Sequence, residues 1–124
     1  MPVNGIVSGV GFDVDKHFSN FPQGSRELAQ VFVDETLKVG GTAPFVTPDG
    51  VGVGFHPNFV WIERIKSRRD GVTVSFYGLP RRHGNHHLLR KSRANYSRAY
   101  VRTQVELTSL LPEIKAAYDL QRAR

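Results

Sequence analysis

The sequence predicts an α+β fold, in which an antiparallel sheet of four to five strands is flanked by an N-terminal and a C-terminal helix. Three observations lead to this prediction: helical apolar spacing from residues 28 to 39, short alternating segments joined by turn residues from 51 to 77, and helical spacing again from 110 to 118. A chain of 124 residues has the usual length of one domain, so we expect residues 1–124 to form a single domain.

The N-terminal part contains the first predicted helix. Apolar and polar residues alternate loosely in residues 1–15, which is typical of either an edge strand or a flexible arm. Ser25 is the predicted N-cap, because its hydroxyl can accept a hydrogen bond from a free N–H of the first turn. Apolar residues then recur at helical spacing from Leu28 to Val39, and Gly40-Gly41 ends the helix.

Three predicted strands follow as an antiparallel meander. Residues 51–55 alternate bulky residues with glycine, and residues 59–66 contain the sole tryptophan, Trp61. Residues 72–77 alternate as well, so that their Val and Phe side chains share one face and Thr, Ser and Tyr share the other. Arg69-Asp70-Gly71 is a strong hairpin signal between the last two of these strands.

A long basic loop and the C-terminal helix are predicted after the meander. Residues 79–93 show no periodicity, and loops of that length tend to be functional or disordered. The helix is expected to begin at Thr108 or Ser109, which can act as N-cap, with Pro112 tolerated in its first turn. Its apolar face runs from Leu110 to Tyr118.

Between the loop and this helix, residues 96–105 are predicted to form one strand with two different faces. Side chains alternate along a strand, so Ala99, Val101 and Val105 are expected on the core side. The opposite side then carries an aromatic and cationic ladder. Its members are Tyr96, Arg98, Tyr100, Arg102 and Gln104.

The charge distribution supports an anionic partner. The formal net charge is +6. Residues 62–102 hold eleven of the seventeen Lys and Arg residues against two carboxylates, a local net charge of +9, while the rest of the chain carries −3. Such a basic block is typical of proteins that bind nucleic acid, acidic protein or a phosphorylated ligand, and the alternative is a solvated basic face.

The order of these elements, ending in Ala117-Tyr118-Asp119, resembles the uncharacterised small α+β domains of the YdhG-like and MmcQ-like kind. The resemblance extends over residues 17–120. It is carried by Pro22, the helix after Ser25, and residues 59–64, 72–77 and 113–118. It implies an antiparallel sheet flanked by helices. That grouping has no diagnostic catalytic motif, so the resemblance assigns no site residue.

The ladder and the basic loop together predict a binding module for nucleic acid or another polyanion. Aromatic rings stack on bases, and arginine contacts phosphates, which suits single-stranded nucleic acid. The alternative is a structural role, in which these side chains lie under a helix or stack on one another. The candidate ligand-binding residues are Tyr77, Arg81, Arg82, Arg90, Lys91, Arg93, Tyr96, Arg98, Tyr100 and Arg102.

Two other functions remain open at this point. The first is a small enzyme with a cleft between sheet and loop, in which His56, His83, His86 or Glu63 acts as acid or base. The second is an interaction protein that buries the ladder in a homodimer, where Tyr and Arg are typical anchors. No local motif joins Ser, His and acid as a catalytic triad, so the sequence assigns no catalytic residue.

Several site types are excluded or disfavoured by residue type and spacing. Cysteine is absent, which excludes thiolate chemistry and cysteine zinc sites. His83, His86 and His87 have only cations around them, so we expect no metal there and no cofactor. Glu63 and Lys66 are three residues apart and fall on opposite strand faces, unlike a nuclease pair, so we expect Glu63 to pair with a nearby arginine. The N-terminus does not resemble a signal peptide and no apolar run approaches a membrane span, so we expect a cytoplasmic protein without a membrane partner.

Overall fold

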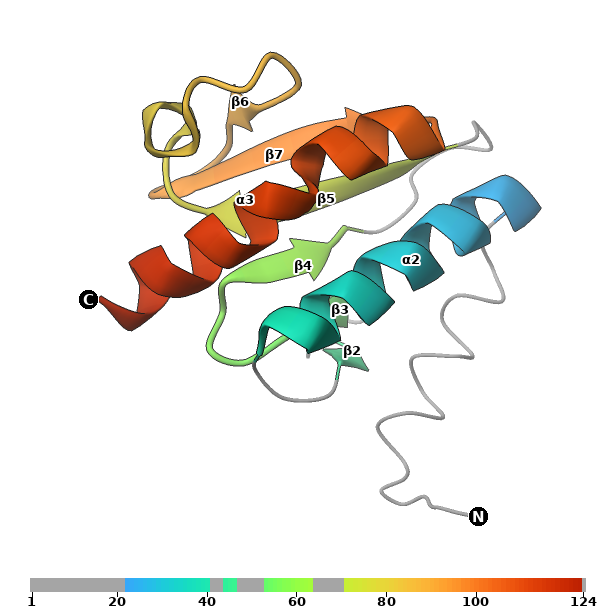
Figure 1. Ribbon diagram of the computed structural model, residues 1–124, viewed down its shortest axis with the longest axis horizontal. Coiled ribbons are helices and arrows are strands. Elements are labelled where there is room, and N and C mark those ends of the chain that lie inside the picture. The colour runs from blue at the N-terminus through green and yellow to red at the C-terminus, as the bar shows by residue number, and fades with distance from the viewer. Residues whose placement is uncertain (1–21, 41–43, 47–52, 64–70, 124) are drawn as a thin grey trace.

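The computed structural model describes residues 22–40, 44–46, 53–63 and 71–123, and it has an α+β fold (Figure 1). The predicted fold class is confirmed, although within these residues the sheet has six strands in place of four to five, and three of the six are only two residues long. In chain order the elements are α2 (Gln23–Val39), β2 (Phe45–Val46), β3 (Val53–Gly54), β4 (Val60–Ile62), β5 (Val72–Tyr77), the 3-10 helix η1 (Pro80–His83), β6 (Arg90–Lys91), β7 (Tyr96–Val101) and α3 (Gln104–Arg122).

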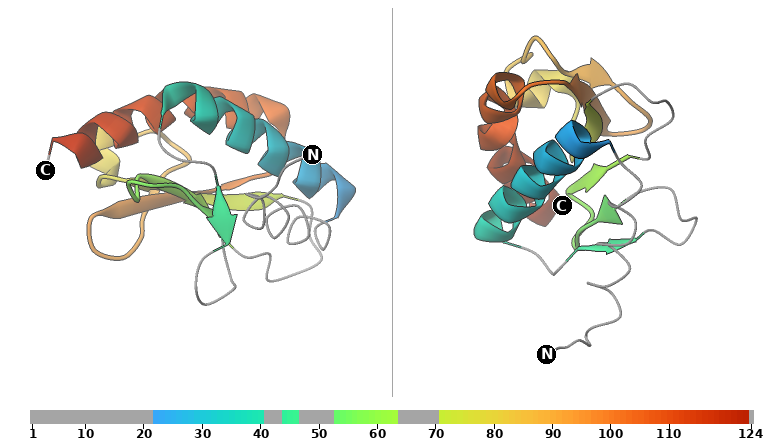
Figure 2. Two further views of the ribbon diagram at one scale, coloured as in Figure 1. Left: turned by 90° about the horizontal axis from the view of Figure 1, so that it is seen from below. Right: turned by 90° about the vertical axis from the view of Figure 1, so that its right-hand side faces the viewer.

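The strands form one antiparallel sheet in the order β2-β3-β4-β5-β7-β6. Both α2 and α3 lie on the same face of this sheet (Figure 2). In the part of the chain that the structure describes, no helix covers the opposite face, which is called the open face below. The predicted meander corresponds to β3, β4 and β5, and the predicted ladder strand to β7.

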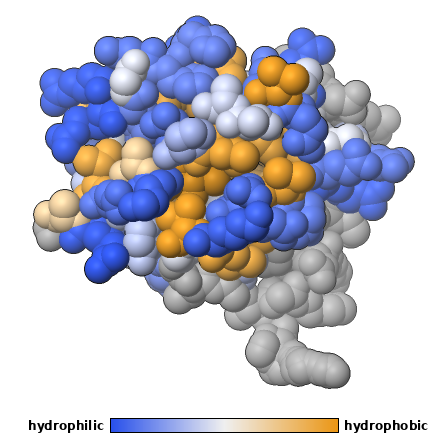
Figure 3. Space-filling view, viewed as in Figure 1, coloured by the Kyte–Doolittle hydropathy of each residue, from blue (hydrophilic) through white to orange (hydrophobic). Residues whose placement is uncertain are grey.

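The hydrophobic core lies between the sheet and the two helices. Val72, Val74 and Phe76 of β5 are fully buried, as the alternation of this strand predicted. Phe32 of α2 meets Phe76 edge-on, with 5.8 Å between the ring centroids. Leu107, Leu110 and Ile114 of α3 complete the core. On the helix side of the molecule, apolar side chains gather between the helices and hydrophilic side chains surround them (Figure 3).

The start of α2 differs from the prediction. Pro22 precedes the first helical residue, and Ser25 lies within the first turn, fully buried. The Ser25 hydroxyl accepts a hydrogen bond from the Gly71 N–H at 2.8 Å, so it ties the helix to the start of β5. The prediction of Ser25 as N-cap is therefore wrong. The predicted end is confirmed, because Val39 is the last residue of α2 and Gly40 follows it.

A capping box at Thr103 decides where β7 ends and α3 begins. The Thr103 hydroxyl accepts from the Glu106 N–H at 3.1 Å, and the Glu106 carboxylate accepts from the Thr103 N–H at 3.2 Å. This pair satisfies free backbone donors of the first turn, so the helix starts at Gln104. The predicted N-caps, Thr108 and Ser109, lie inside the helix.

This earlier helix start changes the second half of the predicted ladder strand. The strand ends at Val101, so Arg102 follows it and Gln104 belongs to α3. Val105, which was expected in the core, is 80% exposed. Pro112 lies inside α3 and not in its first turn.

The segment 79–93, predicted as one long loop, contains two short regular elements. Pro80 opens η1, which ends at Gly84 in the left-handed conformation. Arg90 and Lys91 form β6, which pairs with the first half of β7 as the outer edge of the sheet. Sequence periodicity cannot reveal elements of two to four residues, and these two are fixed by their contacts with β7 and α3.

Neither α2 nor α3 combines the length and the apolar content that a helix needs to cross a membrane. Some of the predictions fall outside the described residues. These are the arm or edge strand at 1–15, the strand ends at residues 51–52 and 64–66, and the residues before Gly71 in the predicted hairpin turn.

A glycine at position 71 is required by both conformation and space. Its φ is +123°, and an added Cβ would lie 2.7 Å from the Val101 carbonyl oxygen and 2.9 Å from the Tyr100 ring. We expect Gly71→Ala to lower the free energy of unfolding by at least about 2 kcal/mol, measured by urea denaturation. Gly24→Ala is the control, because its Cβ would meet nothing within 4 Å, and it is expected to raise stability by about 0.5 kcal/mol. An unchanged free energy of unfolding in Gly71→Ala would contradict this packing.

Candidate nucleic-acid interface

One row of side chains crosses the open face from edge to edge. Residues directly opposite each other in antiparallel strands point to the same face. The pairing between neighbouring strands therefore defines a single row with an aromatic end and a cationic end. The row is Phe45, Gly54, Trp61, Ser75, Arg98 and Arg90.

An aromatic cluster forms around Trp61 of this row and also contains Tyr77 and Tyr96. The three rings come from three neighbouring strands, β4, β5 and β7. Trp61 and Tyr96 have ring centroids 4.6 Å apart, and Tyr77 meets Tyr96 edge-on at 5.2 Å. All three side chains are half-buried, so part of each ring reaches the surface. The Tyr96 hydroxyl donates to the Asn58 carbonyl oxygen at 3.2 Å, which fixes the position of that ring.

Two arginines accompany the aromatic cluster. The guanidinium of Arg93, in the β6–β7 turn, lies over the Trp61 ring at 5.8 Å from its centroid. Arg98 is exposed, lies opposite Ser75 on the open face, and forms no ion pair with any described carboxylate. The open face thus presents stacking surfaces and positive charge within the reach of one ligand.

Arg90 and Arg98 lie directly opposite each other across the β6–β7 pair. Arg90 donates to the carbonyl oxygens of His87 at 2.7 Å and Leu89 at 3.1 Å, which holds its guanidinium near the sheet edge. Like charges at directly opposed strand positions are destabilising. An anion bound between the two guanidinium groups would remove that cost.

Tyr100, Lys91 and Arg102, which were also predicted as site residues, lie outside the aromatic cluster. Tyr100 is on the open face opposite Thr73, beyond Arg98, and its ring packs against Gly71. Lys91 pairs with Ser97, whose side chain points to the helix side, so Lys91 does not share the face of Arg98. Arg102 lies beyond the strand, and its backbone N–H donates to the Glu106 carboxylate at 2.7 Å.

Arg81 and Arg82 are separated from the ladder by the sheet. Both belong to η1, which is held against α3 on the helix side by the contact between His83 and Glu113. They are exposed and form no ion pair with the described carboxylates. The structure therefore does not bring these two residues next to the ladder.

Glu63 places a carboxylate on the open face. Glu63 follows β4, and its backbone N–H donates to the Thr73 carbonyl oxygen at 2.8 Å. Its carboxylate Oε2 accepts from the Ser75 hydroxyl at 2.6 Å. An arginine partner was expected for Glu63, but among the described residues its polar partner is Ser75.

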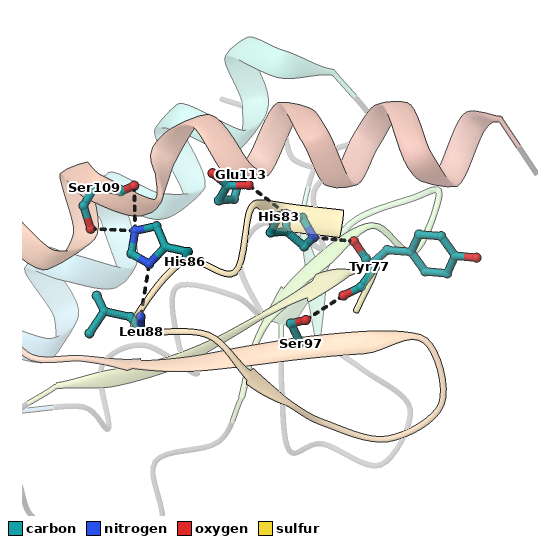
Figure 4. A network of polar contacts seen from close by, with 8 residues as sticks. Tyr77, His83, His86, Leu88, Ser97, Ser109 and Glu113 are labelled. Carbon is teal, nitrogen blue, oxygen red and sulfur yellow. Dashed lines mark hydrogen bonds and ion pairs between the residues drawn. The ribbon is translucent and has the colours of Figure 1, made fainter. Parts of the chain in front are cut away.

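His83 and His86, which were considered for catalysis or metal binding, contact different partners (Figure 4). His83 is buried, and its Nδ1 lies 2.8 Å from Glu113 Oε1 while Nε2 lies 2.9 Å from the Tyr77 carbonyl oxygen. His86 Nε2 lies 3.1 Å from the Ser109 carbonyl oxygen, and His87 stacks on the His86 ring at 4.8 Å. In the described part of the chain, no three His, Asp or Glu residues group closely enough to hold a metal ion.

His56 and Glu63, the other two candidate acid or base groups, lie apart from His83 and His86. His56 is exposed and stacks on Phe45 at 4.9 Å, near the β2 edge. Glu63 is on the open face, whereas His83 and His86 contact α3 on the helix side. The described residues therefore do not assemble the four groups into one acid–base site.

Trp61 was noted in the sequence only as the sole tryptophan and was not included among the site residues. Its neighbours Val60 and Ile62 are fully buried on the core side. Trp61 therefore faces away from the core, and the alternation of apolar residues along this strand could have indicated this from the sequence. The contact between Trp61 and Arg93 could not be predicted in this way, because the two residues are distant in sequence.

No protein-family model, no curated protein and no solved structure matches this chain.

Proposed function

We propose that this protein binds single-stranded nucleic acid on the open face. The observation that carries the proposal is the aromatic cluster with Arg93 and Arg98 on a sheet face that, in the described residues, no helix covers. Sheets with exposed aromatic side chains bind single strands because every base has a flat face that can stack on them. A duplex keeps its base faces stacked inside and cannot use such a platform.

Arg93 and Trp61 favour a planar ligand over a simple polyanion. The guanidinium already lies over the indole ring, at 5.8 Å from its centroid. A stacked ring occupies roughly 3.5 Å on each of its sides, so a base between the two groups needs a separation of about 7 Å. An outward shift of Arg93 by about 1 Å on its turn would give a sandwich of indole, base and guanidinium.

The cationic end of the row supports binding of the phosphate backbone. Neighbouring strands are about 4.8 Å apart, so Arg98 lies roughly 10 Å from Trp61, two strands away. A strand of nucleic acid with one base on Trp61 can therefore place a following phosphate near Arg98 and Arg90. Such a contact neutralises the opposed arginine pair.

The test is a titration of the protein with labelled oligothymidine, followed by fluorescence anisotropy at several salt concentrations. Arg98→Ala is expected to weaken binding about tenfold, the loss of one charge-assisted hydrogen bond. It is also expected to reduce the slope of log affinity against log salt by about 0.7, because one phosphate contact is lost.

Lys115→Ala is the matched control. It removes one positive charge from the exposed side of α3, where Lys115 pairs only with Asp119 among the described residues. We expect it to leave affinity and salt slope close to those of the unchanged protein. Absence of oligothymidine binding, or equal effects of the two substitutions, would overturn the proposal.

A further inference from the structure

We infer that Glu63 makes the open face selective for bases that present hydrogen-bond donors, with guanine bound best. This inference rests on the proposed function and names the ligand class of the same site. It starts from the charge of Glu63: this carboxylate lies on the same face as the arginines and the aromatic rings. A carboxylate repels phosphate, so phosphate binding does not account for it.

The position of Glu63 relative to Trp61 carries the next step. Glu63 continues β4 two residues beyond Trp61, and the hydrogen bond of its N–H to the Thr73 carbonyl oxygen keeps the backbone extended there. Residues two apart on a strand share a face and lie roughly 7 Å from each other. A base stacked on the indole ring can therefore turn its hydrogen-bonding edge toward Glu63.

The Glu63 carboxylate is oriented and still has acceptor capacity. The Ser75 hydroxyl donates to Oε2 at 2.6 Å and so fixes the carboxylate from the neighbouring strand. No other described residue donates to it, and none of the described ion pairs includes it. An ionised carboxylate offers about four acceptor positions, of which Ser75 uses one.

This acceptor distinguishes the bases. Guanine presents its N1–H and N2 amino donors side by side, which matches two carboxylate oxygens. Cytosine and adenine each present one amino donor beside a ring nitrogen acceptor. Thymine and uracil present a single imide N–H between two carbonyl oxygens, which the carboxylate repels. The expected order is guanine, then cytosine and adenine, then thymine or uracil.

The experiment uses the sole tryptophan, Trp61, as its reporter, since a stacked base quenches indole fluorescence. The full chain is titrated with oligothymidine and with the same strand carrying guanine, cytosine or adenine at its central position. We expect the guanine strand to bind about tenfold more tightly than oligothymidine. Glu63→Gln keeps the size of the side chain but loses the charge and one acceptor, so this advantage is expected to fall below about twofold.

Glu27→Gln is the matched control, because Glu27 is an exposed carboxylate of α2 on the helix side. It changes the net charge equally and is expected to retain the guanine preference. Equal binding of all four strands, or a guanine preference that survives in Glu63→Gln, would overturn the inference and leave the proposed function intact. Failure of every strand to bind would overturn both.

Discussion

Replacing His83 by alanine is expected to lower the free energy of unfolding by about 3 kcal/mol. The imidazole is fully buried, and each ring nitrogen faces an oxygen acceptor, Glu113 Oε1 on one side and the Tyr77 carbonyl on the other. Without the ring, a buried carbonyl and a largely buried carboxyl group lose their partner, and η1 loses its link to α3.

Urea denaturation followed by circular dichroism measures this effect. His87→Ala is the control, because His87 is exposed and stacks only on His86, and we expect a change within about 0.5 kcal/mol. A stable His83→Ala variant that had lost oligonucleotide binding would show that His83 serves the ligand and not the fold.

Trp61→Ala is expected to weaken binding of labelled oligothymidine by about tenfold or more, since loss of one stacking ring costs roughly 1 to 3 kcal/mol. The substitution also removes the surface on which Arg93 lies and the neighbour of the Tyr96 ring. Anisotropy of the labelled strand measures the affinity, because the intrinsic fluorophore is lost.

Two further substitutions at this position separate stacking from simple apolar bulk. Trp61→Phe retains a flat ring and is expected to bind within about threefold of the unchanged protein, whereas Trp61→Leu is expected to behave like Trp61→Ala. The comparison is made between variants that unfold at similar temperatures. Equal affinity of the Leu and Phe variants would refute a stacking role for Trp61.

Strand faces were predictable from the sequence. Alternation is a local property, so the sequence alone predicted that Val72, Val74 and Phe76 share one face, and that Tyr96, Arg98 and Tyr100 lie opposite the core side of their strand. The apolar spacing of α2 was equally informative for Leu28, Ala29, Phe32 and Val33, all of which are buried. Element boundaries failed where two local signals competed, as at Thr103, whose capping box ended the strand early.

The composition of the open face shows the limit of such reasoning. Periodicity says which side chains share a face of one strand, but pairing across strands decides which of them become neighbours. The Trp61 ring contacts Tyr96 of β7 and the guanidinium of Arg93, both more than 30 residues later in the chain. The Glu63 carboxylate accepts a hydrogen bond from Ser75 on the neighbouring strand. Arg81 and Arg82, although close to this group in sequence, are held on the other side of the sheet by the His83–Glu113 contact.

Local patterning therefore accounts for the α+β class, the helix faces and the aromatic and cationic side of β7, because these depend on repeats of two or about 3.6 residues within one segment. The set of side chains that a ligand would meet depends on strand register and on contacts between β4, β5, β7 and η1. Those contacts join residues on different elements of the chain. They therefore form only when the core packs and brings these elements together.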